Sequence, residues 1–588
     1  MKKKRGCFKY LAVFCGIFLF AAVSGVWMFW ALPFWGFPAV QMRDVRPPLT
    51  PPWALECWLW EDDVNTAAEV QRLVAGYEQY DIPVRAILID SPWSTRYNDF
   101  HVDEARYPEP EAFFTGLQDR GYRVVLWMTC MVNSENDDTA ITSDRDWFDD
   151  AVRKGYVAGD GFETGWWKGR GGFIDYTNPE AMAWWRGMQK PLFDWGIDGW
   201  KLDGTATFFS SRVGELPVPY QKTHEGWITT RSYMDHYYRD EYEHGLTQNP
   251  EFITLSRAMD GKWTHPEGFA PIDAAPVTWV GDQDHTWSAE DEGLEEALQY
   301  IMMSAEKGYA VIGSDVAGYG GSEIPPELYV RWAQFSALCP LFLHGGHGNR
   351  ALWEYPGETM AIVRKFAWLH QELVPFFYTL VYDAHGGHSD GLPIIRPTGE
   401  DYQYMLGDTF FVAPMYDAKP VRRVTLPEGR WRYLFDNADV LEGPVTVTPS
   451  FPDDEFPVYV REGAVFPLNV SRPYTGFGDE TSEGALTWVI YPGKEGRFAA
   501  REVDTQGIVN VSYKNAGGTL IITGEHFLKP QILRIRVAQA PQSVQRGDTE
   551  LIQDTDWRIE DSLGSQWLVI PWTPDGSTEP ARYTVNGI

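Results

Sequence analysis

The stretch PEAMAWWRGMQKPLFDWGIDGWKLDG (residues 179–204) combines a helix pattern with a short strand that ends in an aspartate. In its first part, residues 179–196, apolar residues recur at the spacing of an amphipathic helix. Its second part, GWKLDG (199–204), is a short apolar run between glycines, which is typical of a buried strand. A helix leading directly into a buried strand indicates the βα order of a parallel sheet or barrel.

The same alternation extends outward in both directions from this stretch. Eight strands are predicted, namely WALECWLW (53–60), RAILID (85–90), YRVVLWM (122–128), GWKLDG (199–204), FITLSR (252–257), PVTWVGD (276–282), YAVIGSD (309–315) and PLFLHG (340–345). Further helix patterns cover 66–80, 110–121 and 289–308. Because eight parallel strands close a (β/α)8 or TIM barrel, the sequence predicts an α/β catalytic barrel over residues 47–384.

The two regions that interrupt or follow this pattern have different compositions. Residues 130–178 are rich in Gly, Trp and Asp and predict an elaborated loop on the active-site face of the barrel. From about residue 385, alternating strands and turn residues replace the helical patterns. This change predicts all-β domains after the barrel: a proximal β-sandwich over 385–467 and a distal β-sandwich over 468–588.

The N-terminal 46 residues indicate a targeting segment. MKKKR precedes an uncharged stretch from Tyr10 to Met42 that is long enough to cross a bilayer of about 30 Å. We therefore predict a cytoplasmic basic tail, a transmembrane signal anchor and a linker over residues 1–46, which leave the catalytic domain extracytoplasmic. The alternative is a signal peptide cleaved near Ala22-Val23-Ser24, which would give a secreted protein.

The overall charge and the cysteines exclude several classes of protein. A net charge of −32 argues against nucleic acid as a partner and favours a neutral substrate. The five cysteines have neither the spacing of a metal site nor that of a disulfide framework. Cys57, Cys130 and Cys339 lie in or beside apolar segments, so we expect them to be buried free thiols. The sequence does not indicate an oligomeric state.

Polar residues recur where the predicted barrel strands end. They are Asp90, Asp203, Arg257, Asp282, Asp315 and His344. A single aspartate at a strand end is more often a turn former or helix cap than a catalytic group. That explanation would have to be repeated at strand after strand here, whereas one ring of hydrogen-bonding groups at a barrel mouth suits a neutral polyhydroxylated ligand.

Asp203 and Asp282 form the pair best placed for acid–base chemistry. Their strands are two apart in a barrel, so the strand ends lie about 10 Å from each other and inward-pointing side chains shorten the gap. Carboxyls about 5–5.5 Å apart suit a retaining glycosidase, and about 6.5–9.5 Å would leave room for the water of an inverting one. The sequence leaves both open.

The motifs around these two residues resemble those of glycoside hydrolase family 31, the α-glucosidase and α-xylosidase family. GIDGWKLDGTA (196–206) resembles the nucleophile segment, and TWVGDQDHTW (278–287) resembles the acid/base segment. The resemblance implies Asp203 as nucleophile and Asp282 as general acid/base. It continues through LSRA (255–258), GSDVAGYGG (313–321) and RWAQFSALCPLFLHGG (331–346).

The resemblance also implies a set of substrate-binding residues. They are Arg257, Asp315 and His344, with Asp90, Lys201 and Trp279 as further candidates. Trp127, at the end of the third strand, is added from its position as a stacking wall for a sugar. No cofactor is implied, and the two histidines of HGGHG (344–348) lack the spaced carboxylate partners of a zinc site.

The implied function is retaining hydrolysis of terminal α-linked sugars in oligo- or polysaccharides through a covalent glycosyl-enzyme. The alternatives are an α-glucan lyase, a transglycosidase and a non-catalytic surface glycan-binding protein. Two departures from the family pattern are visible. The leader stands where family members carry a large β-sandwich, and the family's Asp-Ile-Gly-Gly-Phe segment reads Asp-Val-Ala-Gly-Tyr at 315–319. We expect the second departure to alter the pocket wall beside Asp315.

Overall fold

The structure is a computed structural model. It describes residues 3–28, 45–204, 219–258, 270–321, 323–386, 393–503, 507–573 and 579–588, with side chains from residue 13 onward.

All eight predicted barrel strands are present and form one parallel sheet. They are β1 (Cys57–Glu61), β2 (Ala86–Ile89), β3 (Arg123–Met128), β7 (Gly199–Leu202), β10 (Ile253–Arg257), β11 (Val277–Trp279), β12 (Ile312–Gly313) and β13 (Phe342–His344). The sheet runs in chain order from β1 to β12, and β13 pairs with β1. A parallel bridge from Asp315 to Leu343 joins the two ends. The predicted (β/α)8 barrel is therefore confirmed.

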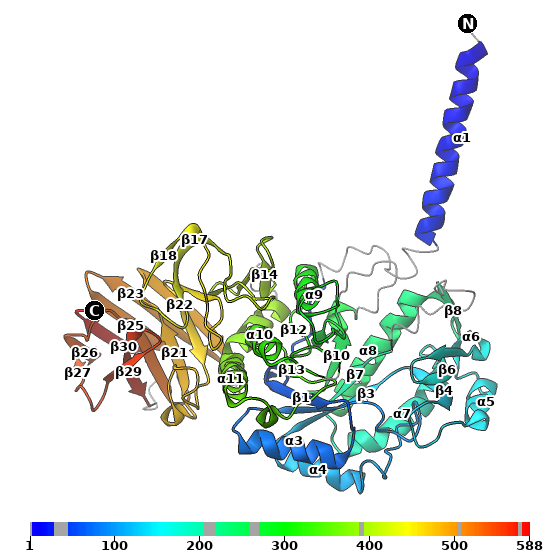
Figure 1. Cartoon of the computed structure of the whole chain (residues 1–588), viewed down its shortest axis with the longest axis horizontal. Coiled ribbons are helices and arrows are strands. Elements are labelled where there is room, and N and C mark those ends of the chain that lie inside the picture. Colours follow the sequence, from blue (N-terminus) through cyan, green and yellow to red (C-terminus); the bar gives the residue numbers. More distant parts are fainter. Residues whose placement is uncertain are drawn as a thin grey trace.

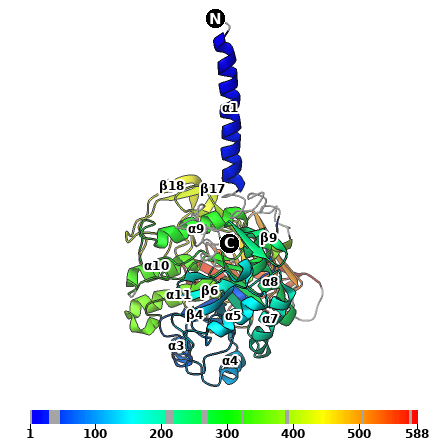
Figure 2. The ribbon, with the colours of Figure 1, turned by 90° about the vertical axis from the view of Figure 1, so that its right-hand side faces the viewer.

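A ring of helices surrounds the barrel (Figure 2). They are α3 (Ala67–Gln79), α4 (Pro110–Asp119), α7 (Pro179–Asp194), α8 (Thr230–Gln248), α9 (Leu294–Lys307), α10 (Pro326–Ser336) and α11 (Gly357–Gly386). The helices predicted at 66–80, 110–121, 179–196 and 289–308 correspond to α3, α4, α7 and α9. Between β10 and β11 the described residues hold the short 3-10 helix η5 (Ile272–Ala274), and residues 259–269 lie outside them.

The segment after β3 forms a small domain-like insertion. Its three-stranded antiparallel sheet has the order β4 (Met131–Asn136), β6 (Gly169–Phe173), β5 (Thr164–Trp166), accompanied by α5 (Arg145–Arg153) and α6 (Ala158–Gly161). β4 begins only three residues after β3 ends, at the carboxyl edge of the barrel. Figure 1 places the insertion on the side of the barrel opposite the C-terminal sheets. The 130–178 stretch is thus a folded insertion at the barrel mouth.

Helix α11 joins the barrel to a β-rich C-terminal part (Figure 1). The first sheet there is antiparallel, in the order β14 (Ile395–Pro397), β15 (Tyr404–Leu406), β16 (Phe410–Val412), β19 (Val458–Arg461), β17 (Val424–Tyr433), β18 (Leu441–Val447). Its apolar side chains belong to the same core as the barrel. This shared core makes the sheet and the barrel one packed body.

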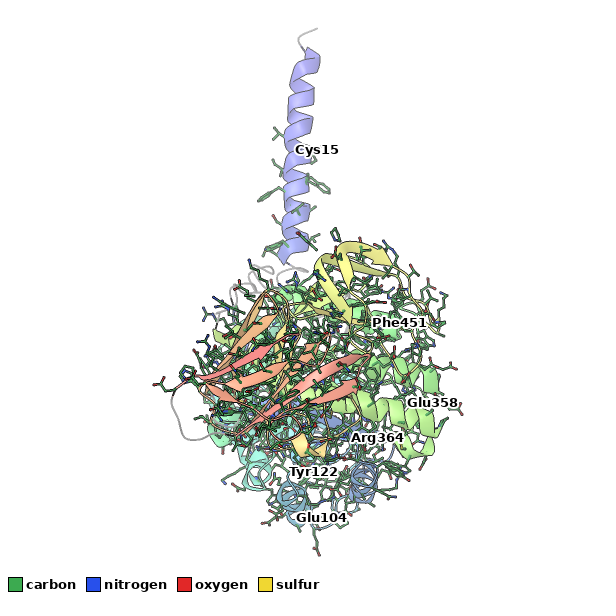
Figure 3. All side chains as sticks on the ribbon, turned by 90° about the vertical axis from the view of Figure 1, so that its left-hand side faces the viewer. Cys15, Glu104, Tyr122, Glu358, Arg364 and Phe451 are labelled. Atoms are coloured by element: carbon green, nitrogen blue, oxygen red, sulfur yellow. The ribbon has the colours of Figure 1, made fainter. Side chains whose placement is uncertain are left out.

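Two further sheets face the viewer in Figure 3 and enclose a separate apolar core. One has the order β20 (Val465–Leu468), β21 (Leu486–Ile490), β25 (Gln531–Val537), β29 (Ser565–Trp572), β28 (Arg558–Ser562). The other has the order β22 (Glu495–Arg501), β23 (Ile508–Ala516), β24 (Thr519–Glu525), β30 (Ala581–Asn586), β26 (Ser543–Arg546), β27 (Thr549–Glu550). The all-β character predicted after the barrel is confirmed, while the domain boundaries stay predictions.

The N-terminal helix α1 (Lys3–Val26) projects away from the rest of the molecule (Figure 1). Within the described part of the chain, no helix combines the length and the apolarity needed to cross a membrane. The transmembrane anchor predicted from the sequence is therefore unsupported by the structure, and residues 29–44 of the apolar stretch lie outside the described residues. Cys15 is exposed on α1 (Figure 3), whereas Cys57, Cys130 and Cys339 are buried free thiols, as expected.

Candidate active site

The structure brings the predicted site residues to one edge of the barrel. Asp90 and Asp203 directly follow β2 and β7, and Arg257 is the last residue of β10. Asp282 follows β11 by three residues, and Asp315 follows β12 by two. These positions are all at carboxyl ends of parallel strands, where the functional groups of such barrels gather.

Asp203 is buried and held by donors on both carboxylate oxygens. Its Oδ1 accepts the backbone N–H of Gly204 at 2.8 Å, and its Oδ2 accepts the indole N–H of Trp127 at 3.2 Å. The single hydroxyl hydrogen of Tyr237 on α8 is shared between the backbone carbonyls of Met128 and Asp203, whose oxygens lie 3.1 Å and 3.0 Å from the hydroxyl oxygen. These bonds fix the carboxylate in one orientation.

Arg257 connects Asp203 to Asp282. Its Nε lies 3.5 Å from Asp203 Oδ1, and its Nη2 lies 2.5 Å from Asp282 Oδ2. The guanidinium is a small planar group, so the nearest oxygens of the two carboxylates lie within about 8 Å of each other. They share one mouth, and this bound includes the spacing of retaining enzymes and the lower part of the range of inverting ones.

The two carboxylates differ in depth. The side chain of Asp282 is 34% exposed and that of Asp203 only 11%. Asp203 therefore lies at the floor of the site, and Asp282 lies closer to solvent.

The charges around Asp203 keep it ionised. Burial acts to raise the pKa of its carboxyl, but Arg257 and Lys201 lower it, helped by the donors from Gly204 and Trp127. The net effect is a pKa below the usual value for aspartate. An ionised, oriented carboxylate is what a nucleophile requires.

Lys201 is a buried cation beside this nucleophile. Its Nζ lies 2.9 Å from Asp90 Oδ2 and 3.7 Å from the ring centre of Trp60, with Trp279 at 5.3 Å. Burial acts to lower the pKa of its ammonium, but Asp90 and then Asp203 raise it above the usual range. The lysine is thus charged, and Asp90 compensates its charge directly.

Asp315 is fully buried, and neither of its oxygens has a hydrogen-bond partner among the described residues. Burial raises the pKa of its carboxyl well above the usual range, and Asp282 raises it further. A neutral carboxylic acid can both donate and accept a hydrogen bond. An unsatisfied buried acid of this kind calls for a ligand hydroxyl or an ordered water.

The surroundings of His344 differ from those expected for the predicted sugar-binding residue. The ring is buried, its Nδ1 lies 2.5 Å from the hydroxyl of Tyr77, and its Nε2 contacts the hydroxyl of Tyr329. Burial lowers the pKa of the imidazole well below its usual value, so the ring is neutral. With both nitrogens engaged by tyrosines, His344 does not present a free polar atom to a sugar, and its binding role stays a prediction.

His347, three residues after His344, also lies at the mouth. It was not among the site residues predicted from the sequence. Its side chain is 37% exposed, its Nδ1 lies 2.8 Å from Asp63 Oδ1, and its Nε2 lies 3.8 Å from Asp62 Oδ2. Asp62 and Asp63 follow β1, the one strand end from which no residue was selected. The same strand-end reasoning, applied to the first strand, would have found them.

Residues 315–319, whose sequence departs from the family pattern, line this part of the mouth. The hydroxyl of Tyr319 donates to Asp62 Oδ2 at 2.8 Å, and the ring centre lies 5.9 Å from Lys201 Nζ. A phenylalanine in this position would lack that hydrogen bond. Ala317 adopts a φ of +72°, a conformation that favours glycine. We expected this departure to alter the wall beside Asp315. The difference is the hydroxyl of Tyr319, which bonds this segment to Asp62.

Arg350 holds the loops after β12 and β13 together. Its guanidinium is buried and donates to the carbonyls of Val316, Gly318 and His347 at 2.7–2.8 Å. This residue was also missed, because a buried arginine that binds only carbonyls has no sequence signature. In the described part of the chain, no cluster of three or more His, Cys, Asp or Glu side chains is arranged to hold a metal ion.

Residues 47–380 match the glycosyl hydrolases family 31 TIM-barrel domain, and residues 391–466 match the family's C-terminal domain. The barrel match alone covers more than half of the chain. The protein therefore belongs to glycosyl hydrolase family 31, and the resemblance seen in the sequence motifs is confirmed.

Relatives and solved structures agree with this assignment. The chain is 27% identical to an alpha-xylosidase of Emericella nidulans, over 72% of this chain and 54% of that one. It is 24% identical to alpha-glucosidase 2 of Bacillus thermoamyloliquefaciens, over 76% and 58%. A Flavobacterium johnsoniae dextranase complexed with glucose has the same fold, with a TM-score of 0.77, 22% identity and coverage of 92% and 71%. The chain thus spans little more than half the length of these two curated relatives.

Proposed function

We propose that this protein is a retaining α-glycosidase that removes terminal α-linked sugars from oligo- or polysaccharides. The observation that carries the proposal is the bridge made by Arg257, which joins a buried ionised Asp203 to a more exposed Asp282 at one mouth. This arrangement supports one carboxylate as nucleophile and the other as proton donor to a departing group.

In the first step an oxygen of Asp203 attacks the anomeric carbon as the bond to the leaving oxygen breaks. Asp282 gives its proton to that oxygen, and a covalent glycosyl-enzyme forms. In the second step Asp282 takes a proton from water, whose oxygen attacks the anomeric carbon and frees Asp203.

The charge of the mouth supports a neutral sugar as substrate. Lys201 is paired with Asp90, and Arg257 with Asp203 and Asp282. Asp315 adds a neutral buried acid suited to a sugar hydroxyl. An anionic sugar would have to break one of these pairs, which favours neutral pentosides or hexosides, in line with the α-xylosidase and α-glucosidase activities in the names of the relatives.

A panel of p-nitrophenyl α-glycosides tests the proposal on the full-length protein. We expect hydrolysis of at least one neutral glycoside with retention of the anomeric configuration, and a loss of at least about 10³-fold in Asp203→Ala. Hydrolysis with inversion, or turnover that survives Asp203→Ala, would contradict it. An anhydro-sugar product would indicate a lyase, transfer to added sugars a transglycosidase, and binding without turnover a glycan-binding protein.

We retain an extracytoplasmic location as a second proposal, supported by MKKKR and the uncharged stretch that follows it. Protease treatment of intact cells should then digest the barrel, whereas a cytoplasmic barrel would be protected. Replacing Lys2, Lys3, Lys4 and Arg5 with glutamate should reduce the digested fraction.

A further inference from the structure

The loop that carries Asp282 is joined to the neighbouring loop immediately after this residue. The carbonyl of Gln283 accepts the backbone N–H of Tyr319 at 2.7 Å and that of Gly320 at 2.9 Å. In return, the backbone N–H of His285 donates to the carbonyl of Gly320 at 2.9 Å. Asp282 is therefore one residue away from the point where the loop after β11 is fastened to the loop after β12.

The side chain of His285 extends this junction to a third loop. The residue is buried, with 9% of its surface exposed. A Cβ at Gly321, in the loop after β12, would lie 2.9 Å from the ring Nδ1. A Cβ at Gly348, in the loop after β13, would lie 3.0 Å from the ring Cε1. The imidazole thus packs against both loops at positions where only glycine leaves it room.

The ring of His285 is neutral in this place. Burial lowers the pKa of the imidazole, the guanidinium of Arg350 lowers it further, and the resulting value is about 4. Arg350 also ties the same two loops together through their carbonyls. At neutral pH the ring therefore acts on its surroundings through its shape and not through a charge.

Asp282 depends on its loop more than Asp203 does. The carboxylate of Asp203 accepts hydrogen bonds from Gly204 and Trp127, whereas that of Asp282 is 34% exposed and binds Arg257. A general acid must lie within hydrogen-bonding reach of the oxygen that it protonates. Because a displacement of about 1 Å can lower a rate by about 10²-fold, the position of the Asp282 backbone matters for proton donation.

We infer that His285 is a positioning residue for proton donation, which holds the Asp282 loop against the loops after β12 and β13. The inference rests on the proposed function of Asp282 as proton donor. His285 acts on the reaction only through Asp282. The loss on removing its ring must therefore depend on how much a substrate needs a proton on its departing group.

Two substrates with the same retained sugar differ in this need. The sugar that departs from a disaccharide requires a proton on its oxygen, whereas fluoride departs from an α-glycosyl fluoride with little help. In His285→Ala of the full-length protein we expect kcat/KM for the disaccharide to fall about tenfold or more. For the fluoride we expect a change of less than about threefold. His285→Gln, which has a side chain of similar volume, should recover most of the loss.

His370→Ala is the matched control. His370 lies on α11 and is also buried, and burial lowers the pKa of its imidazole to about 4 as well. Its Nε2 lies 2.8 Å from the carbonyl of Leu55, which precedes β1 at the barrel edge opposite the mouth. Loss of this ring should lower the melting temperature without separating the two substrates.

Equal losses on both substrates in His285→Ala, or an unchanged kcat/KM for the disaccharide, would overturn the positioning role. If His285→Ala does not fold, His285→Asn also shortens the side chain and is held to the same expectations. Asp282→Ala serves as the reference, with a loss of about 10²–10⁴-fold on the disaccharide and a much smaller one on the fluoride. Equal losses in Asp282→Ala would instead contradict the proposed function, so the two failures are distinguishable.

Discussion

The indole of Trp127 has a more specific task than the stacking wall predicted for it. It is buried and donates a hydrogen bond to Asp203 Oδ2, while Trp166 covers its ring. Burial raises the pKa of Asp203, and the hydrogen bond from Trp127 lowers it, as Arg257 and Lys201 also do. A ring at the end of a strand could be foreseen from the sequence, but the atom that its N–H reaches could not.

Trp127→Phe tests this role, because phenylalanine keeps an aromatic ring and removes the N–H. A hydrogen bond to a charged group contributes about 1.5–3 kcal/mol, so we expect kcat/KM to fall by about tenfold or more. The pKa of Asp203, now below its usual value of about 3.9, should rise. Since the nucleophile acts in its ionised form, the acid limb of the pH profile of kcat/KM should move to higher pH.

The matched control is Trp93→Phe. The indole of Trp93 donates to the backbone carbonyl of Trp127 at 2.6 Å and not to a carboxylate. Its loss should lower the melting temperature without moving the acid limb. If Trp127→Phe leaves the acid limb in place, the indole N–H has no role in holding Asp203 ionised.

At the scale of elements, the loop after β11 is shaped around Arg257. Gly281 has a φ of +102°, and a Cβ there would lie 2.6 Å from Arg257 Nη1. The loop therefore leaves the space that the guanidinium needs to reach both Asp203 and Asp282. A side chain at this position would compete with the bridge on which the proposed function depends.

Gly281→Ala should displace Arg257 and lower kcat/KM by at least about tenfold, the effect expected for loss of one well-placed charged contact. Gly308→Ala is the matched control, because its φ is +105° and a Cβ there meets only Ile272 Cδ1 at 3.8 Å. Both variants should lose roughly 1–2 kcal/mol of stability from the strained backbone. Equal activity of the two would show that the space beside Arg257 is unimportant.

Elements were predictable where both faces of a strand are buried. β2 and β3 are short strands rich in Val, Ile and Leu, and their burial inside a ring of helices explains the apolar runs seen in the sequence. The insertion was predicted only as an elaborated loop. Its strands are interrupted by residues such as Gly169, Gly171 and Gly172, whose missing side chains let neighbouring backbone approach closely and weaken any strand pattern.

For the whole molecule, Glu372 marks the place where the barrel meets the C-terminal sheets. It lies on α11, fully buried, with its Oε2 accepting the hydroxyl of Thr475 at 2.7 Å and its backbone carbonyl accepting the N–H of Asn469 at 2.8 Å. Burial raises the pKa of this carboxyl to about 8, although Thr475 and Arg534 lower it. The side chain is therefore neutral at pH 7 in the folded protein.

This raised pKa makes stability depend on pH. The contribution of the protonated carboxyl is complete below the unfolded-state pKa of about 4.3 and is lost as pH rises through about 8, at up to about 1.4 kcal/mol per pH unit. Glu372→Gln keeps the neutral form at every pH. We expect its melting temperature to fall less than that of the wild type between pH 5.5 and pH 8.

Glu358→Gln, on the exposed first turn of the same helix, serves as the control and should follow the wild type. Parallel pH curves for Glu372→Gln and the wild type would mean that the buried carboxyl does not hold its proton in the folded state.

The sequence alone determined the eight-stranded barrel, the all-β character of the C-terminal part, the family, and the positions of Asp203, Arg257, Asp282 and Asp315 at the mouth. These features follow from local patterns, because a buried parallel strand must be apolar along its length and a functional barrel residue must stand where a strand ends.

Only the tertiary structure decided which atoms meet. It engaged both nitrogens of His344 with tyrosines, brought His347 to the mouth, and joined Trp127 to Asp203 and Tyr319 to Asp62. These contacts link residues far apart in the chain, and their directions depend on strand register and loop path across the whole ring. His344 and His347 are only three residues apart in the chain, yet the first ring is buried and the second is partly exposed. No local sequence pattern distinguishes the two.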